Sequence, residues 1–319
     1  MTFLFSVMID KKTKIAVVMG GPSTEVEISR KTGTAIYQAL LGLGYNVIPM
    51  ELNPKTIMHD LVEGGIEVVF NALHGLYGED GRIQSILESM GIPYTGSGVL
   101  ASAVAMDKSA TKRYLDYDGI NTPKFLLFNR RYDSVLDVEK KVISEIGIPL
   151  VVKAASQGSS IGVEIVKDAQ NLTEKIAACF EYGENLVVEE YIEGKELTCA
   201  VMERDGKPYA LPMIWIEPHV GFYDFRNKYT KGCTTYHCPA PIGEELTAKA
   251  RDLALRTYKS LGLRGVARID MIMDKKDEIF VFEANTVPGM TETSLVPKMA
   301  AAAGIGFPAL CEMILLSAR

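Results

Sequence analysis

The N-terminal part of the chain alternates apolar strands with amphipathic helices, and this pattern limits the possible folds more than any other feature. Continuous apolar runs predict strands at residues 14–19, 46–52 and 67–73. A helix with a possible capping box at Thr24 and Glu27 follows the first strand, and a second helix separates the other two strands. This βαβαβ order predicts a parallel sheet with ligands beyond the carboxyl ends of its strands.

Two polar loops lie at such strand ends. Residues 20–25 read GGPSTE, and residues 71–81 read NALHGLYGEDG. The first loop lacks the GxGxxG spacing, and no acidic residue follows where a dinucleotide ribose would need one, so a nicotinamide enzyme is excluded. Glu25 either complements a helix dipole or holds a substrate ammonium group. His74 either stabilises its turn or contacts the substrate.

A β-hairpin is predicted near the C-terminus. Residues 266–273 and 278–284 are rich in apolar and β-branched residues, and a short polar turn separates them. Asp270 lies in the first strand, whereas Glu283 and Asn285 share one face at the end of the second. The pairing of the two strands allows all three side chains to reach the same face.

This hairpin offers oxygen ligands beside a cation. Two carboxylates and an amide suit a hard ion such as Mg²⁺, which also takes ligands from substrate phosphates. Arg268, in the first strand, suits the charge that develops in phosphoryl or acyl transfer. A solvated strand face explains one carboxylate alone equally well, but the combination with Asn285 and the turn at Gly289 favours the metal site.

The central part of the chain has features of a nucleotide site. A strand at residues 149–154 carries Lys153 and is followed by a loop, residues 156–162, that consists mostly of glycine and serine. Such a loop either offers backbone N–H groups to phosphate oxygens or is a flexible turn. Residues 186–191 predict a strand whose backbone can meet an adenine edge, and Glu196 beyond it can accept bonds from ribose hydroxyls. Neither signal is specific alone.

A long segment without clear secondary structure covers residues 222–236. It is polar and aromatic, and it contains Lys228 and Tyr229. Loops of this length are uncommon in compact domains unless they are functional. We therefore expect it to form a lid over the active site.

Length, charge and cysteine usage restrict the class of protein. A chain of 319 residues predicts two or three domains. The net charge of −6 argues against a nucleic acid or an anionic membrane as partner, and no apolar run approaches the roughly 20 residues of a membrane span. Five cysteines without CxxC spacing indicate free thiols and a cytoplasmic location.

Eight segments, taken in order, resemble the D-alanine–D-alanine ligases of the ATP-grasp superfamily. They are GGPSTEVEIS, ALHGLYGEDG, MDK, VVKAASQGSSIG, VEEYIEGKE, YDFRNKYTKGCTTY, RIDM and FEANTVPGMTETSLVP. The resemblance covers nearly all of the chain after residue 14. It implies an α/β fold with a parallel-sheet N-terminal domain (residues 1–108). A central domain (109–200) and a C-terminal domain (201–319) follow as the α+β ATP-grasp part, with ATP between their antiparallel sheets. It also implies a homodimer.

The resemblance assigns residues to ATP. Two lysines and the small-residue loop contact the phosphates, the strand at 186–191 meets adenine, and an acidic residue beyond it meets the ribose. The lid adds one more lysine when it closes. The implied residues are Lys108, Lys153, Ser159, Ser160, Glu189, Tyr191, Ile192, Glu196, Lys228 and Asn285.

It also assigns the amino-acid site. Glu25 holds the ammonium group of the first D-alanine, with His74 nearby, and Ser294 takes the carboxylate of the second D-alanine. Arg268 and the Gly289 N–H face the oxyanion.

The lid completes this implied site. Ser159 and Tyr229 link Glu25 in a hydrogen-bonded relay. A lid with the Lys-Tyr sequence resembles the dipeptide-forming branch more than the branch that makes D-alanyl-D-lactate.

The implied reaction uses ATP as co-substrate. The first carboxylate attacks the γ-phosphoryl group to give an acyl phosphate, which the second amine attacks. Asp270, Glu283 and Asn285 carry two Mg²⁺ ions, which Mn²⁺ can replace. Two alternatives stay open: a ligase with another acceptor, such as D-lactate or D-serine, and a silent nucleotide-binding protein of the same fold. A silent relative should lack the metal ligands or the arginine, and this chain has them.

Overall fold

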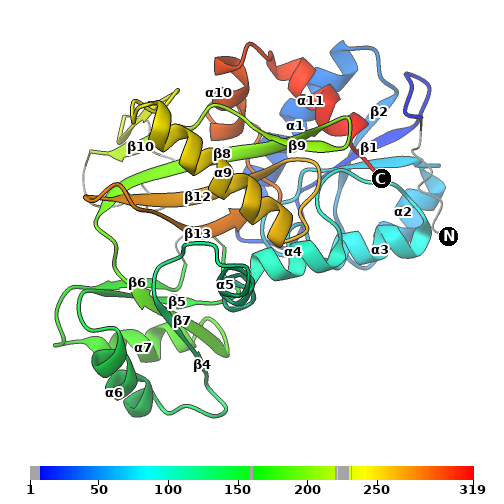
Figure 1. Ribbon diagram of the computed structural model, residues 1–319. Helices are drawn as coiled ribbons and strands as arrows, with labels where there is room; N and C mark the ends of the chain where they lie inside the picture. Colours follow the sequence, from blue (N-terminus) through cyan, green and yellow to red (C-terminus); the bar gives the residue numbers. More distant parts are fainter. Residues whose placement is uncertain (1–7, 159–160, 220, 222–229, 231) are drawn as a thin grey trace.

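The computed structural model describes residues 8–158, 161–219, 221, 230 and 232–319, and it contains three sheets that follow one another along the chain (Figure 1). The first is parallel, with strand order β2-β1-β3, so the predicted βαβαβ unit is confirmed. Its elements are β1 (Ile15–Met19), α1 (Val26–Gly42), β2 (Val47–Glu51), α2 (Ile57–Glu63), β3 (Val68–Asn71) and α3 (Arg82–Met90).

Strand β1 is buried on both faces, which explains its unbroken apolar sequence. Ile15 and Val17 point to the side of α1, whereas Ala16 and Val18 pack with residues of α2 and α3. The predicted capping box does not form. Glu25 occupies the N-cap of α1 without a side-chain cap, and its amide instead donates to Ser23 Oγ at 3.1 Å.

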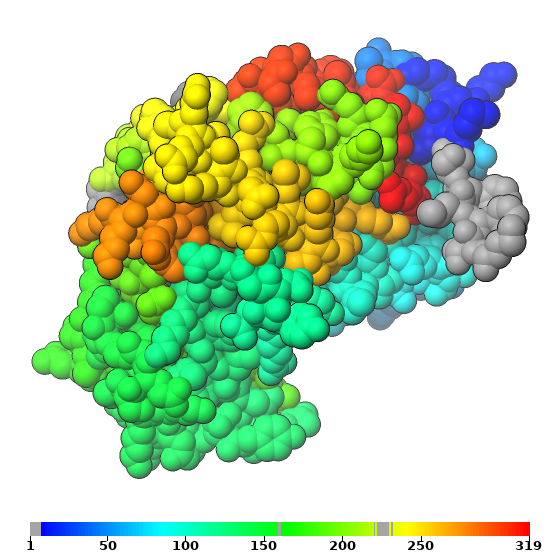
Figure 2. Space-filling view, viewed as in Figure 1, coloured from blue at the N-terminus to red at the C-terminus, as the bar shows by residue number. Residues whose placement is uncertain are grey.

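The second sheet is antiparallel, with strand order β4-β7-β5-β6. Two helices pack against it around a core that includes Val142, Leu150 and Ile176. In Figure 2 this unit forms a lobe that projects from the rest of the molecule. Its elements are β4 (Phe125–Asn129), α6 (Val135–Glu145), β5 (Leu150–Ala154), β6 (Val163–Val166), α7 (Leu172–Phe180) and β7 (Asn185–Glu190).

The third sheet has six strands in the order β11-β10-β8-β12-β13, with β9 paired to the other end of β8. The predicted hairpin is its β12-β13 pair, and α9 crosses the sheet in Figure 1. The bounds are β8 (Gly194–Arg204), β9 (Lys207–Ala210), β10 (Ile214–Pro218), β11 (Thr234–His237), α9 (Glu244–Ser260), β12 (Ala267–Asp274) and β13 (Ile279–Asn285).

Two helices meet at residues 106–108. Helix α4 (Val99–Met106) ends before Asp107, which has an extended backbone and starts α5 (Lys108–Tyr117). The Asp107 side chain accepts a hydrogen bond from the Ala110 amide at 2.9 Å. Asp107 therefore caps the N-terminus of α5, and its extended backbone ends α4.

The C-terminal helices return to the N-terminal sheet. Helices α10 (Leu295–Ala302) and α11 (Phe307–Leu316) share one apolar core with β1, α1 and β8. Met299 and Ile314 are among its buried members. This core fixes the first sheet against the third, and the loop that leads into α10 therefore meets the loops at the carboxyl ends of β1 and β3.

No single described helix is long and apolar enough to cross a membrane. Helices α10 and α11 pass that test only as a pair, with a bend of 104° between them.

The three-domain division stays a prediction. The expected boundary at residue 200 lies inside β8, all of which belongs to the third sheet, so we propose that the last unit begins near Gly194.

Candidate active site

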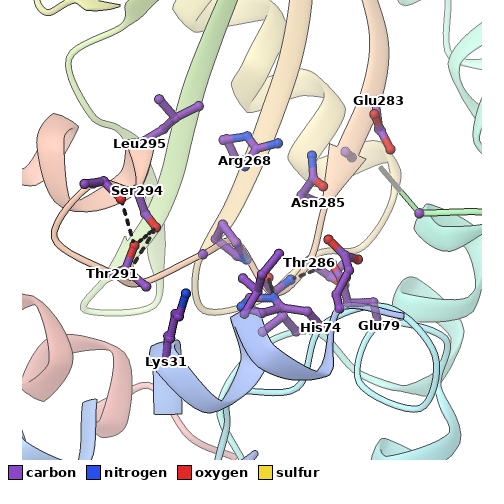
Figure 3. Close-up of a pocket in the computed structure, with 18 of the residues that line it drawn as sticks. Lys31, His74, Glu79, Arg268, Glu283, Asn285, Thr286, Thr291, Ser294 and Leu295 are labelled. Atoms are coloured by element: carbon purple, nitrogen blue, oxygen red, sulfur yellow. Dashed lines mark hydrogen bonds between the residues drawn. The ribbon is translucent and has the colours of Figure 1, made fainter. Parts of the chain in front are cut away.

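A cavity of about 580 Å³ lies where the three units meet (Figure 3). Its walls come from the start of α1, the loop after β3, the end of α4, the loop after β5, the end of β13 and the loop before α10. Eight of the residues singled out from the sequence line it: Glu25, His74, Lys108, Arg268, Glu283, Asn285, Gly289 and Ser294.

Arg268 and Asp270 form a buried pair on one wall. The two residues share a face of β12 because they are two positions apart. Arg268 Nε and Nη2 donate to the two carboxylate oxygens of Asp270 at 2.8 and 2.7 Å. Thr198 Oγ1 and Asn285 Nδ2 donate to the same carboxylate at 2.5 and 2.9 Å. Three elements of the third sheet thus hold Asp270 in one orientation.

Glu283 stands opposite Asp270 in the β12-β13 ladder. Lys108 Nζ lies 3.5 Å from Glu283 Oε1 and donates to the carbonyl of Gln157 at 2.7 Å. The lysine at the start of α5 therefore connects the predicted metal ligands with the predicted phosphate loop. This arrangement agrees with a site for a metal-bound polyphosphate.

The predicted oxygen ligands fit a hard cation in their chemistry. Asp270 and Glu283 face each other across the ladder, and Asn285 follows two positions after Glu283. Among the described residues, no group of three or more histidine, cysteine, aspartate or glutamate side chains could hold a metal. A site with two carboxylates and one amide leaves room for substrate oxygens among its ligands.

Glu25 lies where the first and second units approach each other. A β-carbon on Gly75 would lie 3.3 Å from Glu25 Oε2, and one on Gly158 would lie 3.2 Å from the same atom. Both glycines allow their loops to reach the carboxylate. The predicted phosphate loop and the loop after β3 thus enclose Glu25 at the N-terminus of α1.

His74 and Glu79 hold the peptide groups on either side of Val287. His74 Nδ1 is 2.9 Å from the Val287 carbonyl oxygen, and the Val287 amide donates to Glu79 Oε1 at 3.3 Å. Glu79 Oε2 also accepts the Gly75 amide at 2.7 Å, and His74 Nε2 is 3.0 Å from Thr32 Oγ1. In Figure 3, His74 and Glu79 lie beside the N-terminal part of α1, the helix that carries Lys31.

The pKa of the Glu79 carboxyl group is raised toward neutral pH. Burial is the main cause, and the nearby negative charge of Glu25 adds to it, so the pKa of Glu79 rises to about 7. Hydrogen bonds from Gly75 and Val287 act in the opposite direction.

The loop before α10 forms the remaining wall. Ser294 Oγ accepts the Thr291 amide at 3.0 Å and lies 2.8 Å from Thr291 Oγ1, as the dashed lines in Figure 3 show. A β-carbon on Gly289 would come within 2.9 Å of Ser294 Oγ. The glycine therefore allows the serine hydroxyl to face the cavity.

Other residues assigned to ATP lie outside the lining of this cavity. Glu189 is buried in β7 between two lysines: Lys112 Nζ is 2.6 Å from Oε2, and Lys153 contacts Oε1. Burial opposes ionisation, but the two lysines hold the pKa of Glu189 at about 2. Tyr191 and Ile192 follow β7, and the Tyr191 amide donates to the Pro149 carbonyl at 3.2 Å. The last of these residues, Glu196, lies in β8.

Two family models match the chain. The model described as "D-ala D-ala ligase C-terminus" matches residues 114–316, and "D-ala D-ala ligase N-terminus" matches residues 54–97. The chain belongs to the D-alanine–D-alanine ligase family. Its fold is the ATP-grasp fold of that family, preceded by the parallel sheet, as the sequence predicted.

Curated relatives agree over nearly the whole length. The D-alanine–D-alanine ligase of Moorella thermoacetica is 47% identical over 94% of this chain and 97% of the relative. The D-alanine–D-alanine ligase of Carboxydothermus hydrogenoformans is 44% identical over 95% of this chain and 97% of the relative.

Solved structures agree as well. The Bacillus anthracis D-alanine–D-alanine ligase complexed with ATP has a TM-score of 0.81 and 38% identity over 97% of both chains. The VanG D-Ala:D-Ser ligase of Enterococcus faecalis has a TM-score of 0.82 but a lower sequence identity of 29%. The match covers 95% of this chain and 98% of that ligase.

Four residues assigned from the family resemblance lie outside the described residues. They are Ser159, Ser160, Lys228 and Tyr229. Of the expected lid, the structure describes residues 230 and 232–236. Its last three residues belong to β11, which pairs with β10, so this end of the segment has regular structure that the sequence did not predict.

Sequence reasoning missed three functional candidates in this family member. Glu79 stands inside the motif ALHGLYGEDG but was not singled out. Lys112 lies one helical turn after Lys108, a spacing that could have marked it. Thr198 gave no sequence signal, because only strand pairing brings it opposite Asp270.

Proposed function

We propose that this protein joins two molecules of D-alanine to D-alanyl-D-alanine and converts ATP to ADP and phosphate in the same reaction. One observation carries the proposal. A single cavity gathers an acidic residue at a helix N-terminus, a buried arginine and a serine-bearing loop beside the oxygen ligands of the hairpin, in a chain that belongs to this ligase family. The product would serve peptidoglycan precursor synthesis, and we propose a cytoplasmic homodimer.

The first D-alanine would bind between Glu25 and Arg268. The Glu25 carboxylate would hold its ammonium group, and Arg268 would lie near its carboxylate. His74 and Glu79 would act indirectly, because their described bonds fix the Val287 segment between Asn285 and Gly289. His74 also lines the cavity, and its predicted contact with the substrate stays a prediction.

ATP would lie between the second and third sheets. Lys108 and Lys153 would contact its phosphates together with the loop that contains Ser159 and Ser160, and Glu189 would accept the exocyclic amine of adenine. The residues proposed to complete the site are Tyr191 and Ile192 for the base, Glu196 for the ribose and Lys228 for the phosphates.

Asp270, Glu283 and Asn285 would hold two Mg²⁺ ions, or Mn²⁺ in their place. A bound divalent ion supplies neutralisation of the charge on the transferred phosphoryl group. The donor set supports this assignment, because hard oxygen ligands suit Mg²⁺.

The chemistry would proceed in two displacements. A carboxylate oxygen of the first D-alanine attacks the γ-phosphorus, and the bond to the ADP oxygen breaks. The neutral amine of the second D-alanine then attacks the acyl carbon, and phosphate leaves from the tetrahedral intermediate. Arg268 and the Gly289 N–H would stabilise the oxyanion of that intermediate.

The acceptor would be held and activated on the other side of the cavity. Ser294 would bind the carboxylate of the second D-alanine. Ser159 and Tyr229 would form a relay with Glu25 near the attacking amine.

The first test is phosphate release from Mg-ATP with D-alanine alone, with L-alanine, and with D-alanine plus D-lactate or D-serine. Mass spectrometry identifies the products. We expect release that depends on D-alanine, with D-alanyl-D-alanine as the main product in every mixture. A mixed product as the main species would show that the acceptor is D-lactate or D-serine. The absence of phosphate release would contradict the ligase and support a silent nucleotide-binding protein.

A further inference from the structure

Lys112 is a buried lysine at the boundary between the second and third sheets. Lys112 is 2% exposed. Its Nζ lies 2.6 Å from Glu189 Oε2 and donates a hydrogen bond of 2.6 Å to Thr122 Oγ1. An isolated charge at such a depth is costly, so a lysine persists there only with compensating partners. None of the roles proposed above uses Lys112.

The partners of Lys112 belong to both sheets. Glu189 is in β7 of the second sheet, whereas Thr122 donates to the carbonyl of Val281 in β13 at 2.7 Å. Helix α5, which carries the lysine, contacts both β7 and β13 and lies between the two sheets in Figure 1. Lys112 Nζ therefore fixes the Glu189 carboxylate relative to the hairpin of the third sheet.

The two lysines beside Glu189 have different surroundings. Lys153 is on β5, and its Nζ lies 5.3 Å from the Phe282 ring centre. In the proposed function, Lys153 contacts the ATP phosphates. Lys112 is anchored by Thr122 and by the Pro123 carbonyl at 3.4 Å. When Lys153 turns to the phosphates, Lys112 is the described cation that stays with Glu189.

We propose that Lys112 is a positioning residue for nucleobase selection, which keeps the Glu189 carboxylate ionised and aimed at the exocyclic amine of adenine. An ionised carboxylate only accepts hydrogen bonds. It binds the amine of adenine and repels the carbonyl oxygen that guanine carries at the same place. This inference rests on the proposed function, since it assumes that Glu189 meets the base.

The charges around Glu189 predict a pH signature. Lys112 comes from α5 and Lys153 from β5, while Glu190, next along β7, adds a negative charge near Lys112. Burial raises the pKa of Glu189, and the lysines more than offset it. Without Lys112, and with Lys153 engaged by phosphates, burial should raise the pKa of Glu189, so a larger fraction of the carboxyl is protonated and adenine binds less well.

The test compares Lys112→Met, Lys112→Gln, Glu189→Gln and the control Lys249→Met. Lys249 is exposed on α9 and pairs with Glu245 at 2.8 Å, so its replacement removes a surface ion pair. For each protein, KM for Mg-ATP and Mg-GTP, KM for D-alanine and kcat are measured from pH 6 to 9. Thermal unfolding identifies the variants that fold.

We expect Lys112→Met to raise KM for ATP roughly tenfold or more at pH 7, the loss of one charged hydrogen bond, with KM for D-alanine unchanged. The KM of this variant for ATP should fall as pH rises. The ratio of its KM for GTP to its KM for ATP should be smaller than in the wild type. Lys112→Gln, which keeps a donor but no charge, should show a smaller effect with the same pH trend. It also serves as the test if the methionine variant does not fold.

Two outcomes separate the possible errors. If Glu189→Gln raises KM for ATP at every pH while both Lys112 variants behave as the wild type, the role of Lys112 is refuted. If Glu189→Gln has no effect on KM for ATP or on base preference, the proposed contact of Glu189 with adenine is itself wrong.

Discussion

Arg268 and Asp270 lie two positions apart on β12 and form two parallel hydrogen bonds of 2.8 and 2.7 Å. The pair is almost completely buried at the wall of the cavity. A guanidinium fixed in this way keeps its orientation without loss of side-chain entropy during the reaction. One carboxylate thus both orients the proposed oxyanion residue and belongs to the proposed metal ligands.

Replacement of Arg268 by alanine should lower kcat by about 100- to 1000-fold, because a fixed donor to the oxyanion is lost. ATP binding measured by calorimetry should persist. Arg268→Lys keeps the charge but loses the two-pronged bond, so its activity should be intermediate. Lys249→Ala, on the surface, is the control. Normal turnover of the alanine variant would refute the role of Arg268.

Replacement of Gly289 by alanine should raise KM for the acceptor D-alanine. The added β-carbon would lie 2.9 Å from Ser294 Oγ, which cannot easily move because it is bonded to Thr291. Gly42→Ala at the end of α1 meets nothing within 4 Å and serves as the matched control. Steady-state kinetics at saturating ATP checks the effect, and equal KM values in the two variants would contradict it.

Replacement of His74 by alanine should lower kcat/KM for D-alanine by about tenfold, because the partly buried Val287 carbonyl loses the hydrogen bond to His74. The segment between Asn285 and Gly289 would then be held less firmly. His59 is exposed on α2, where it lies beside the carboxylates of Asp60 and Glu63 at the surface, so His59→Ala is the control. An unchanged His74 variant would show that Val287 is held well enough without it.

Glu79 should make stability depend on pH. Its pKa is about 7 in the folded protein and 4.5 as the usual value. A raised folded-state pKa stabilises the protein fully below about pH 4.5, and this contribution is lost as pH rises through about 7. The difference in Tm between the wild type and Glu79→Gln should therefore shift against the wild type between pH 5.5 and 8.

Calorimetric melts of both proteins across this range measure that shift. The amide is neutral at every pH, so effects of other titrating groups cancel in the difference. A difference in Tm that stays constant with pH would show that Glu79 does not titrate in this range.

The sequence by itself determined the elements and the type of site. The apolar run at residues 14–19 predicted the strand that the structure has as β1, and two-residue spacing predicted that Glu283 and Asn285 share one face at the end of β13. Such patterns are local, since strand and helix geometry fix which neighbours along the chain share a face. The order of short motifs then pointed to the family.

Only the tertiary structure decided how distant segments meet. The bonds of His74 and Glu79 to Val287 join residues more than 200 positions apart, and Lys112 reaches Glu189 from another element. Local spacing carries no information about such contacts, because they depend on how buried faces pack: α10 and α11 press the first sheet against the third through one shared core. That packing, which minimises exposed apolar surface over the whole chain, brings the cavity walls together.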